Sequence, residues 1–188
     1  MADGHQRDTV MSDEPRVRGF LAMSLDGFIA GTNDEIDWLN VADGSEDTFT
    51  PFFTQIGALL MGRRSYDVAS GFDGPWPYGD TPVLVATHRD LKPKAPSVSA
   101  IAGTIAELVA KAKATSAPRD VYIDGGQIVR QALDAGLVDE ITVTLIPTVL
   151  GKGIALFHGV ERQHGLELVS QRAIGKGLVS LVYVPKQA

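Results

Sequence analysis

The chain has 188 residues, of which 44% are hydrophobic and 21% are charged, a balance typical of a soluble globular domain with a sizeable core. Its formal net charge of −6 argues against a general nucleic-acid or anionic-membrane surface, because both need clustered cations. The absence of cysteine excludes disulfides, thiolate metal ligands and cysteine nucleophiles, and it fits a cytoplasmic protein.

Residues 1–15 are polar and lack the apolar centre of a secretory signal, which predicts a disordered N-terminal tail. Met11 is an alternative start of translation within it. Residues 16–188 are expected to form a single domain, because no repeat, low-complexity segment or linker interrupts them. No apolar run approaches the roughly 20 residues that a membrane helix needs.

Strand-like and helix-like patterns alternate along this domain. The first half predicts a buried strand (17–23), a turn with a short extended piece (24–31) and a helix capped by Ser45 (45–56). A short apolar strand (57–62), a helix that starts after Gly62 (63–70) and a further strand (81–88) are expected to follow. The second half predicts an amphipathic helix (104–114), a strand (120–123) and a helix stopped by Gly136 (126–136). A long strand (138–150) and a hairpin around a Gly-Lys-Gly turn (166–185) are expected to follow. This alternation is typical of a mostly parallel α/β sheet, to which the hairpin adds antiparallel strands at one edge.

Two glycines, Gly125 and Gly126, stand where the predicted strand 120–123 gives way to a helix. In open α/β sheets, ligands bind outside the carboxyl ends of the strands. The first turn of a helix offers unpaired N–H groups and the positive end of the helix dipole, and glycines there let a pyrophosphate come close. A turn that only packs the helix against the strand explains the two glycines equally well.

The segment 62–65 repeats this pattern, with Arg63 and Arg64 in the first helical turn. Cations are unfavourable at a helix N-terminus, but a bound anion would offset them, and arginine binds phosphate bidentately. A solvated basic helix face is the alternative. Two glycine-containing helix starts in one small sheet favour a nucleotide with several phosphates.

A third strand end carries Thr87, His88 and Arg89, which could contact a ribose, an adenine or a further phosphate. The remaining histidines are scattered and form no metal-ligand pattern, so no metal site is expected.

Five motifs follow one another along the chain: "AMSLDGFIAG", "IDWL", "LLMGRRSYD", "VYIDGGQIVRQAL" and "LVDEITVTLIPTVLGKGIALF". In this order they resemble the dihydrofolate reductase-like superfamily, and more closely its branch with the bacterial riboflavin-synthesis reductase domain, the RibD C-terminal domain. The resemblance runs from about Val17 to the C-terminus. It implies a three-layer α/β/α fold, an NADPH-dependent reductase, a small-molecule substrate and a homodimer.

The resemblance also implies which residues bind NADPH. Arg63 would hold the 2′-phosphate, Arg64 and Ser65 would help to bind the phosphates, and backbone groups of Ala22 and Ile29 would hold the nicotinamide carboxamide. The other implied cofactor contacts are Thr87, His88 and Arg89 on the adenosine side, Gly125, Gly126, Gln127 and Ile128 around the pyrophosphate, and Gly62 and Asp124.

Dihydrofolate reductases carry an acidic residue at the start of the first long helix, and Glu46 and Asp47 stand at about that place. We expect one of them to donate a proton or to anchor the substrate. A carboxylate that only stabilises the helix dipole, with water as the proton donor, is the alternative. Asp26, Trp38 and Phe52 are expected to contact the substrate, although Asp26 also suits a turn and both aromatic residues also suit a core.

The riboflavin branch carries a lysine two residues before the alanine of "AMSLDG", where this chain has Phe20. The predicted function is an NADPH-dependent reductase that transfers a hydride to a C=N or C=O of a small heterocyclic substrate. That substrate would be pteridine-like or ribosylaminopyrimidine-like, as in dihydrofolate reductase or 5-amino-6-(5-phosphoribosylamino)uracil reductase. The alternative is an NADPH-binding protein without turnover, acting as a sensor or scaffold.

Overall fold

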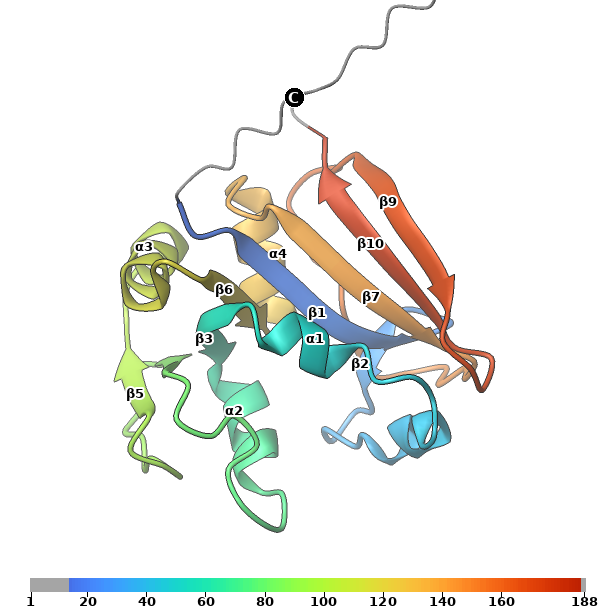
Figure 1. The fold of residues 1–188 in the computed structure, drawn as a ribbon, viewed down its shortest axis with the longest axis horizontal. Coiled ribbons are helices and arrows are strands. Elements are labelled where there is room, and N and C mark those ends of the chain that lie inside the picture. Colours follow the sequence, from blue (N-terminus) through green and yellow to red (C-terminus); the bar gives the residue numbers. More distant parts are fainter. Residues whose placement is uncertain (1–13, 187–188) are drawn as a thin grey trace, which may run out of the picture.

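The computed structural model describes residues 14–186, so most of the predicted N-terminal tail lies outside the described residues. An eight-stranded sheet forms the centre of the molecule, in the order β5-β4-β3-β6-β1-β7-β10-β9 (Figure 1). Its strands are β1 (Val17–Ser24), β3 (Ile56–Gly62), β4 (Val83–Ala86), β5 (Val98–Ile101), β6 (Asp120–Asp124), β7 (Glu140–Ile146), β9 (Leu166–Ala173) and β10 (Val179–Pro185). The short strands β2 (Phe28–Ala30) and β8 (Ile154–Ala155) pair with each other beside it.

Strands β5, β4, β3, β6, β1 and β7 pair in parallel, whereas β10 pairs antiparallel with both β7 and β9. The predicted mostly parallel sheet with a C-terminal antiparallel hairpin is therefore confirmed. Because all the parallel strands run the same way, the loops that follow β1, β3, β4, β5 and β6 meet at one edge of the sheet.

Helices cover both faces of the sheet: α1 (Phe49–Phe53) and α2 (Arg63–Ser70) on one face, α3 (Ile105–Ser116) and α4 (Gly126–Asp134) on the other (Figure 1). Successive strand residues point to opposite faces, and β3 shows this directly. Leu60 packs into the core under α3 and α4, while Leu59 and Met61 pack with Phe52 and Tyr66 of α1 and α2. The fold is the three-layer α/β/α arrangement.

Two predicted boundaries differ from the structure, and two short strands were not predicted. The first helix begins at Phe49 and not near Ser45, because the Asp47 carboxylate accepts hydrogen bonds from the backbone N–H groups of Phe49 and Thr50, at 3.0 and 2.9 Å. The last parallel strand ends at Ile146, since the following proline has no N–H to continue the ladder. Strands β5 and β8, with only four and two residues, are too short to stand out in the sequence.

The amino-terminal end of β1 carries a buried cation, Arg18, whose side chain is 9% exposed. Its guanidinium donates to Glu140, Gln55 and Asp120 at 2.8, 2.8 and 3.2 Å and lies 4.9 Å above the ring of Phe52. This cluster joins β1, β6 and β7 at the end opposite to the loops that follow the parallel strands. Among residues 14–186, no helix is long and apolar enough to cross a membrane.

Candidate cofactor and substrate site

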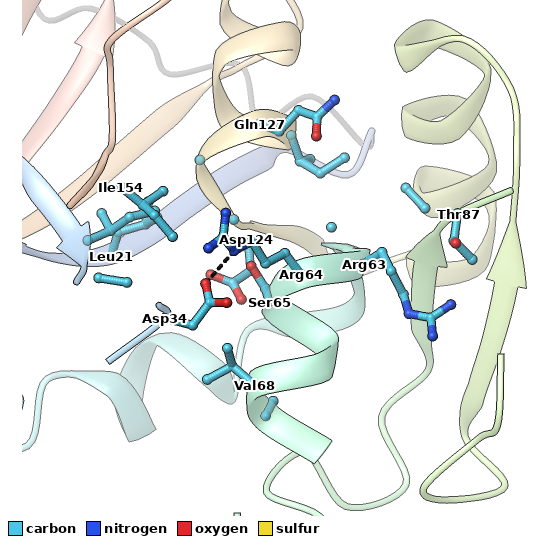
Figure 2. A pocket seen from close by; sticks show the side chains of 18 of the residues that line it. Leu21, Asp34, Arg63, Arg64, Ser65, Val68, Thr87, Asp124, Gln127 and Ile154 are labelled. Atoms are coloured by element: carbon cyan, nitrogen blue, oxygen red, sulfur yellow. Dashed lines mark hydrogen bonds and ion pairs between the residues drawn. The ribbon is translucent and has the colours of Figure 1, made fainter. Parts of the chain in front are cut away.

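A cavity of about 660 Å³ opens at the edge where the parallel strands end (Figure 2). In Figure 2, Arg63 and Thr87 lie at one end of it and Leu21 and Ile154 at the other. Every residue that the sequence analysis assigned to the cofactor lines this cavity: Ala22, Ile29, Gly62, Arg63, Arg64, Ser65, Thr87, His88, Arg89, Asp124, Gly125, Gly126, Gln127 and Ile128. The topology thus brings together segments that are far apart in the sequence.

Two guanidinium groups share one carboxylate at the Arg63 end of the cavity. Arg63 Nε donates to Asp67 Oδ1 at 2.7 Å, and Arg89 Nη2 lies 3.5 Å from Asp67 Oδ2. Arg63 Nη1 also donates to the carbonyl of Asp90 at 2.9 Å. This end of the cavity therefore has two cations for one carboxylate, and it could accept a further anionic group.

Arg64, the next residue on α2, reaches in another direction. It forms an ion pair with Asp34, in the loop that follows β2 (dashed line in Figure 2). Its Nη2 donates to the carbonyl of Thr32 at 3.4 Å. Arg64 thus ties the loop after β2 to the start of α2.

The glycines at the start of α4 are required by their surroundings. Gly125 has φ +94°, and a Cβ there would lie 2.5 Å from the hydroxyl oxygen of Ser65. A Cβ on Gly126 would lie 2.8 Å from Nη1 of Arg130 and 3.2 Å from Cδ1 of Ile29. No side chain caps α4 or α2, so the backbone N–H groups of both first turns are left for another acceptor. The two glycines therefore serve the packing, and no side chain covers the helix start.

The cavity extends to both faces of the sheet. On the α3–α4 face it is lined by residues such as Leu108 and Gln131. On the other face, Tyr122 belongs to the core cluster of α1 and α2, and Asp124 lies two residues further along the same strand, hence on the same side. We call this part the α2-side compartment; its residues are Phe20, Ala22, Ile36, Leu39, Val68, Ala69, Phe72, Tyr78, Tyr122 and Asp124.

Asp124 is the carboxyl group of the α2-side compartment. Burial raises its pKa to about 6, because the ionised form loses solvation, and the neighbouring Gly125 backbone and Tyr122 side chain offset this only in part. The pKa of Tyr78 is raised by burial and by the charge of Asp124, and the pKa of Tyr122 is raised for the same two reasons. Sequence reasoning missed both tyrosines and assigned Asp124 to the cofactor, although its spacing from Tyr122 on one strand places the two on the same face.

The two carboxylates predicted as proton donors, Glu46 and Asp47, are not among the residues that line the cavity. Glu46 forms an exposed ion pair with Arg172, at 2.8 Å. Asp47 accepts hydrogen bonds at the start of α1, and these bonds lower its pKa. Because α1 begins later than predicted, the structure directs Asp47 to the helix backbone and leaves Glu46 in solvent.

The three predicted substrate contacts also lie outside this cavity. Phe52 is 5% exposed and packs against Phe20 and Tyr122, with ring centroids 4.8 and 5.3 Å away. Trp38, on the 3₁₀ helix η1 (Asp37–Ala42), packs in a separate core cluster, while the neighbouring Ile36 and Leu39 line the cavity. Phe52 and Trp38 therefore pack in core clusters, which is the alternative to substrate contact given in the sequence analysis.

Asp26 has a turn role. Its carboxylate accepts hydrogen bonds from the hydroxyl of Ser24 and the backbone N–H groups of Leu150 and Gly151, at 2.6, 3.1 and 2.7 Å. These bonds, with that of Ser24 the largest contribution, lower its pKa to about 2. Asp26 therefore fastens the loop after β7 to the turn after β1, and it lines a second, more open cavity.

The fold is that of the dihydrofolate reductase-like α/β proteins. Dihydrofolate reductase from Enterococcus faecalis, in complex with NADP(H), superposes with a TM-score of 0.65 over 92% of this chain and 97% of its own, at 16% identity. At that identity the similarity shows the fold.

The sequence comparison is more specific. The family model of the RibD C-terminal domain matches residues 15–180, so the chain belongs to the RibD C-terminal domain family. The uncharacterized protein YyaP of Bacillus subtilis (strain 168) is 32% identical over 177 residues, which cover 87% of this chain and 91% of YyaP. The structure of a putative riboflavin biosynthesis protein from Shewanella sp. PV-4 superposes with a TM-score of 0.78 at 28% identity, over 92% of this chain and 99% of that one. The resemblance read from the motifs is confirmed.

Proposed function

We propose that this protein is a cytoplasmic, homodimeric, NADPH-dependent reductase that transfers a hydride to a C=N or C=O of a small heterocyclic substrate. One observation carries the proposal: the carboxyl ends of four parallel strands and the segments that follow them bring all the residues assigned to the cofactor to one cavity. Membership of a reductase-type family supports it.

The cavity residues suit the parts of NADPH. Arg63 and Arg89, held together by Asp67, would bind the 2′-phosphate. Gly125 and Gly126 would let the pyrophosphate approach the uncapped start of α4. When bound, NADPH would supply the hydride, and the protein would position it and exclude water.

The homodimer is proposed from the family resemblance and from the edge of the sheet. Strand β9 is one of the two edge strands of the sheet, and its residues Leu168 and Val169 are 45% and 59% exposed. An edge strand offers unpaired backbone groups to another chain. Light scattering coupled to size-exclusion chromatography would give twice the chain mass if a second copy pairs there.

Calorimetric titration of the purified protein with NADPH, with NADH as the comparison, tests the cofactor assignment. We expect NADPH to bind at least about tenfold more tightly, a difference of roughly 1.4 kcal/mol. No binding of either nucleotide would overturn the reductase proposal. If NADPH binds tightly but no offered heterocycle oxidises it, the protein would instead be a sensor or scaffold. The position of Glu46 and Asp47 outside the cavity is consistent with that alternative.

A further inference from the structure

The second cavity, of about 680 Å³, borders the ribbon that β2 and β8 form. Its lining is mostly apolar and includes the rings of Phe28 and Phe157. It shares only Ile154 and Arg130 with the first cavity, and none of the residues assigned to the cofactor lines it. The proposed function therefore gives this cavity no role.

Arg130, on α4, is the cation of the second cavity. Its Nη1 donates to the carbonyl oxygens of Ala155 and Leu156, each at 3.0 Å, and these two bonds hold the guanidinium against β8. Among residues 14–186, Arg130 takes part in no ion pair, and its Nε and Nη2 have no hydrogen-bond acceptor. Neither atom is fully buried, so a ligand can reach both.

The unoccupied side of this guanidinium suits a carboxylate. Its Nε–H and one Nη2–H point the same way, and the two oxygens of a carboxylate accept them as a pair. Hydrogen bonds of this kind are roughly twice as strong as those between neutral groups. A cationic ligand would instead be repelled by Arg130.

The rest of the lining restricts the ligand further. The oxygens of Asp26 accept hydrogen bonds from Ser24, Leu150 and Gly151, and these bonds lower the pKa of this carboxyl to about 2, so it is ionised. Because its charge lies in the same cavity, a ligand with more than one negative charge would be repelled. The two aromatic rings in turn favour a planar apolar body.

We propose that the second cavity is a separate ligand site, which binds a small aromatic monocarboxylate through Nε and Nη2 of Arg130, with its ring against Phe28 and Phe157. This inference goes beyond the proposed function and does not depend on hydride transfer. Since the two cavities share only Ile154 and Arg130, we expect the carboxylate and NADPH to bind at the same time.

The first test uses 2-naphthoate as the probe, titrated into the full chain and detected by the NMR shifts of backbone amides. We expect the largest shifts at Gly27, Phe28 and Ala155, and small ones at Thr87 and Gln127 of the first cavity. The uncharged 2-naphthamide has the same ring, and it should bind at least about tenfold more weakly. Saturating NADPH should change the Kd of 2-naphthoate less than about threefold.

The second test replaces the cation. Arg130→Met removes the charge but keeps an unbranched side chain, and it should weaken 2-naphthoate binding at least about tenfold. Arg162→Met is the matched control, because this exposed arginine lines neither cavity, and it should leave binding unchanged. Arg130 also holds two carbonyl groups of the chain, so thermal unfolding checks that each variant is folded. If the methionine variant does not fold, Arg130→Lys keeps the charge without the paired donors and should weaken binding at least about threefold.

The inference would be overturned by no binding of 2-naphthoate to the wild-type protein, by equal binding of the amide, or by shifts centred on the first cavity. Displacement of 2-naphthoate by NADPH would overturn it as well, since the probe would then lie in the first cavity. Wild-type-like binding by a folded Arg130 variant, or an equal loss in Arg162→Met, would show that Arg130 does not hold the carboxylate.

Discussion

Arg63 and Asp67 face each other across one turn of α2, where Arg63 Nε donates to Asp67 Oδ1 at 2.7 Å. The second oxygen of Asp67 lies 3.5 Å from Nη2 of Arg89, which comes from the loop after β4. One carboxylate thus orients two guanidinium groups from different elements before any ligand binds. Side chains that are already oriented lose less entropy on binding, so this arrangement would favour the phosphate contact proposed above.

Arg63→Ala should discriminate between the two nicotinamide cofactors. Loss of a charge-assisted contact to the 2′-phosphate should raise the Kd of NADPH about 10- to 100-fold, in line with about 1.5–3 kcal/mol for such a bond. NADH has no such phosphate, so its Kd should change little. Titration calorimetry of both nucleotides measures this, with Arg172→Ala as a control, since that arginine pairs with Glu46 outside the cavity. Equal weakening of both nucleotides would contradict the 2′-phosphate role.

Asp67→Asn should have the opposite effect on NADPH. The amide oxygen can still accept the hydrogen bond from Arg63, but the negative charge next to the phosphate is removed. We expect NADPH to bind about two- to fivefold more tightly at low salt, as for an exposed charge pair, and NADH to be unaffected. The gain should shrink as ionic strength rises, because exposed charges are screened. Weaker NADPH binding would mean that the orienting role of Asp67 outweighs its charge.

The residues assigned to the cofactor were easier to bring to one cavity from the sequence than those assigned to the substrate, for a physical reason. Residues such as Arg63 and Gly125 directly follow apolar strands, and parallel strands must bring their carboxyl ends to one edge. The role of Asp47 depended on where α1 begins, which is set by its own hydrogen bonds to the helix backbone. The burial of Asp124 and the position of Tyr78, in the loop after α2, arise only from tertiary packing.

Gly125→Ala should be costly in two ways. The residue has φ +94°, and its new Cβ would lie 2.5 Å from the hydroxyl oxygen of Ser65. Gly136→Ala is the matched control: its φ is +68°, and a Cβ there meets no atom within 4 Å, so only backbone strain is added. Urea unfolding should show a loss of about 1–2 kcal/mol for the control and at least about 1 kcal/mol more for Gly125→Ala. Equal losses would mean that Ser65 moves aside freely.

The buried cation at the other end of β1 is expected to matter for stability and not for ligand binding. Arg18→Met would leave Asp120 and Glu140 half-buried without their main partner, at a cost of about 3–5 kcal/mol. Arg16 pairs with the same two carboxylates from a more exposed position, so Arg16→Ala should cost no more than about 1 kcal/mol. Denaturant unfolding of the two variants measures the difference. A cost below 1 kcal/mol for Arg18→Met would show that Arg16 can replace it.

The raised pKa of Asp124 predicts how stability depends on pH. Its ordinary pKa of 3.8 becomes about 6 in the folded protein, where Tyr78 and Tyr122 share its surroundings and lower its solvation. Between pH 4 and 6 the folded state therefore holds a proton that the unfolded state has released, so this group makes stability fall as pH rises through that range. The change of this pKa from 3.8 to about 6 corresponds to about 3 kcal/mol. Asp26 and Asp47 have lowered pKa values, so they act in the opposite direction and only at lower pH.

The difference in unfolding free energy between the wild-type protein and Asp124→Asn, measured from pH 4 to 7, isolates the contribution of Asp124. It should grow in favour of the asparagine variant up to about pH 6 and then level off, and a difference independent of pH would show that Asp124 ionises normally in the fold.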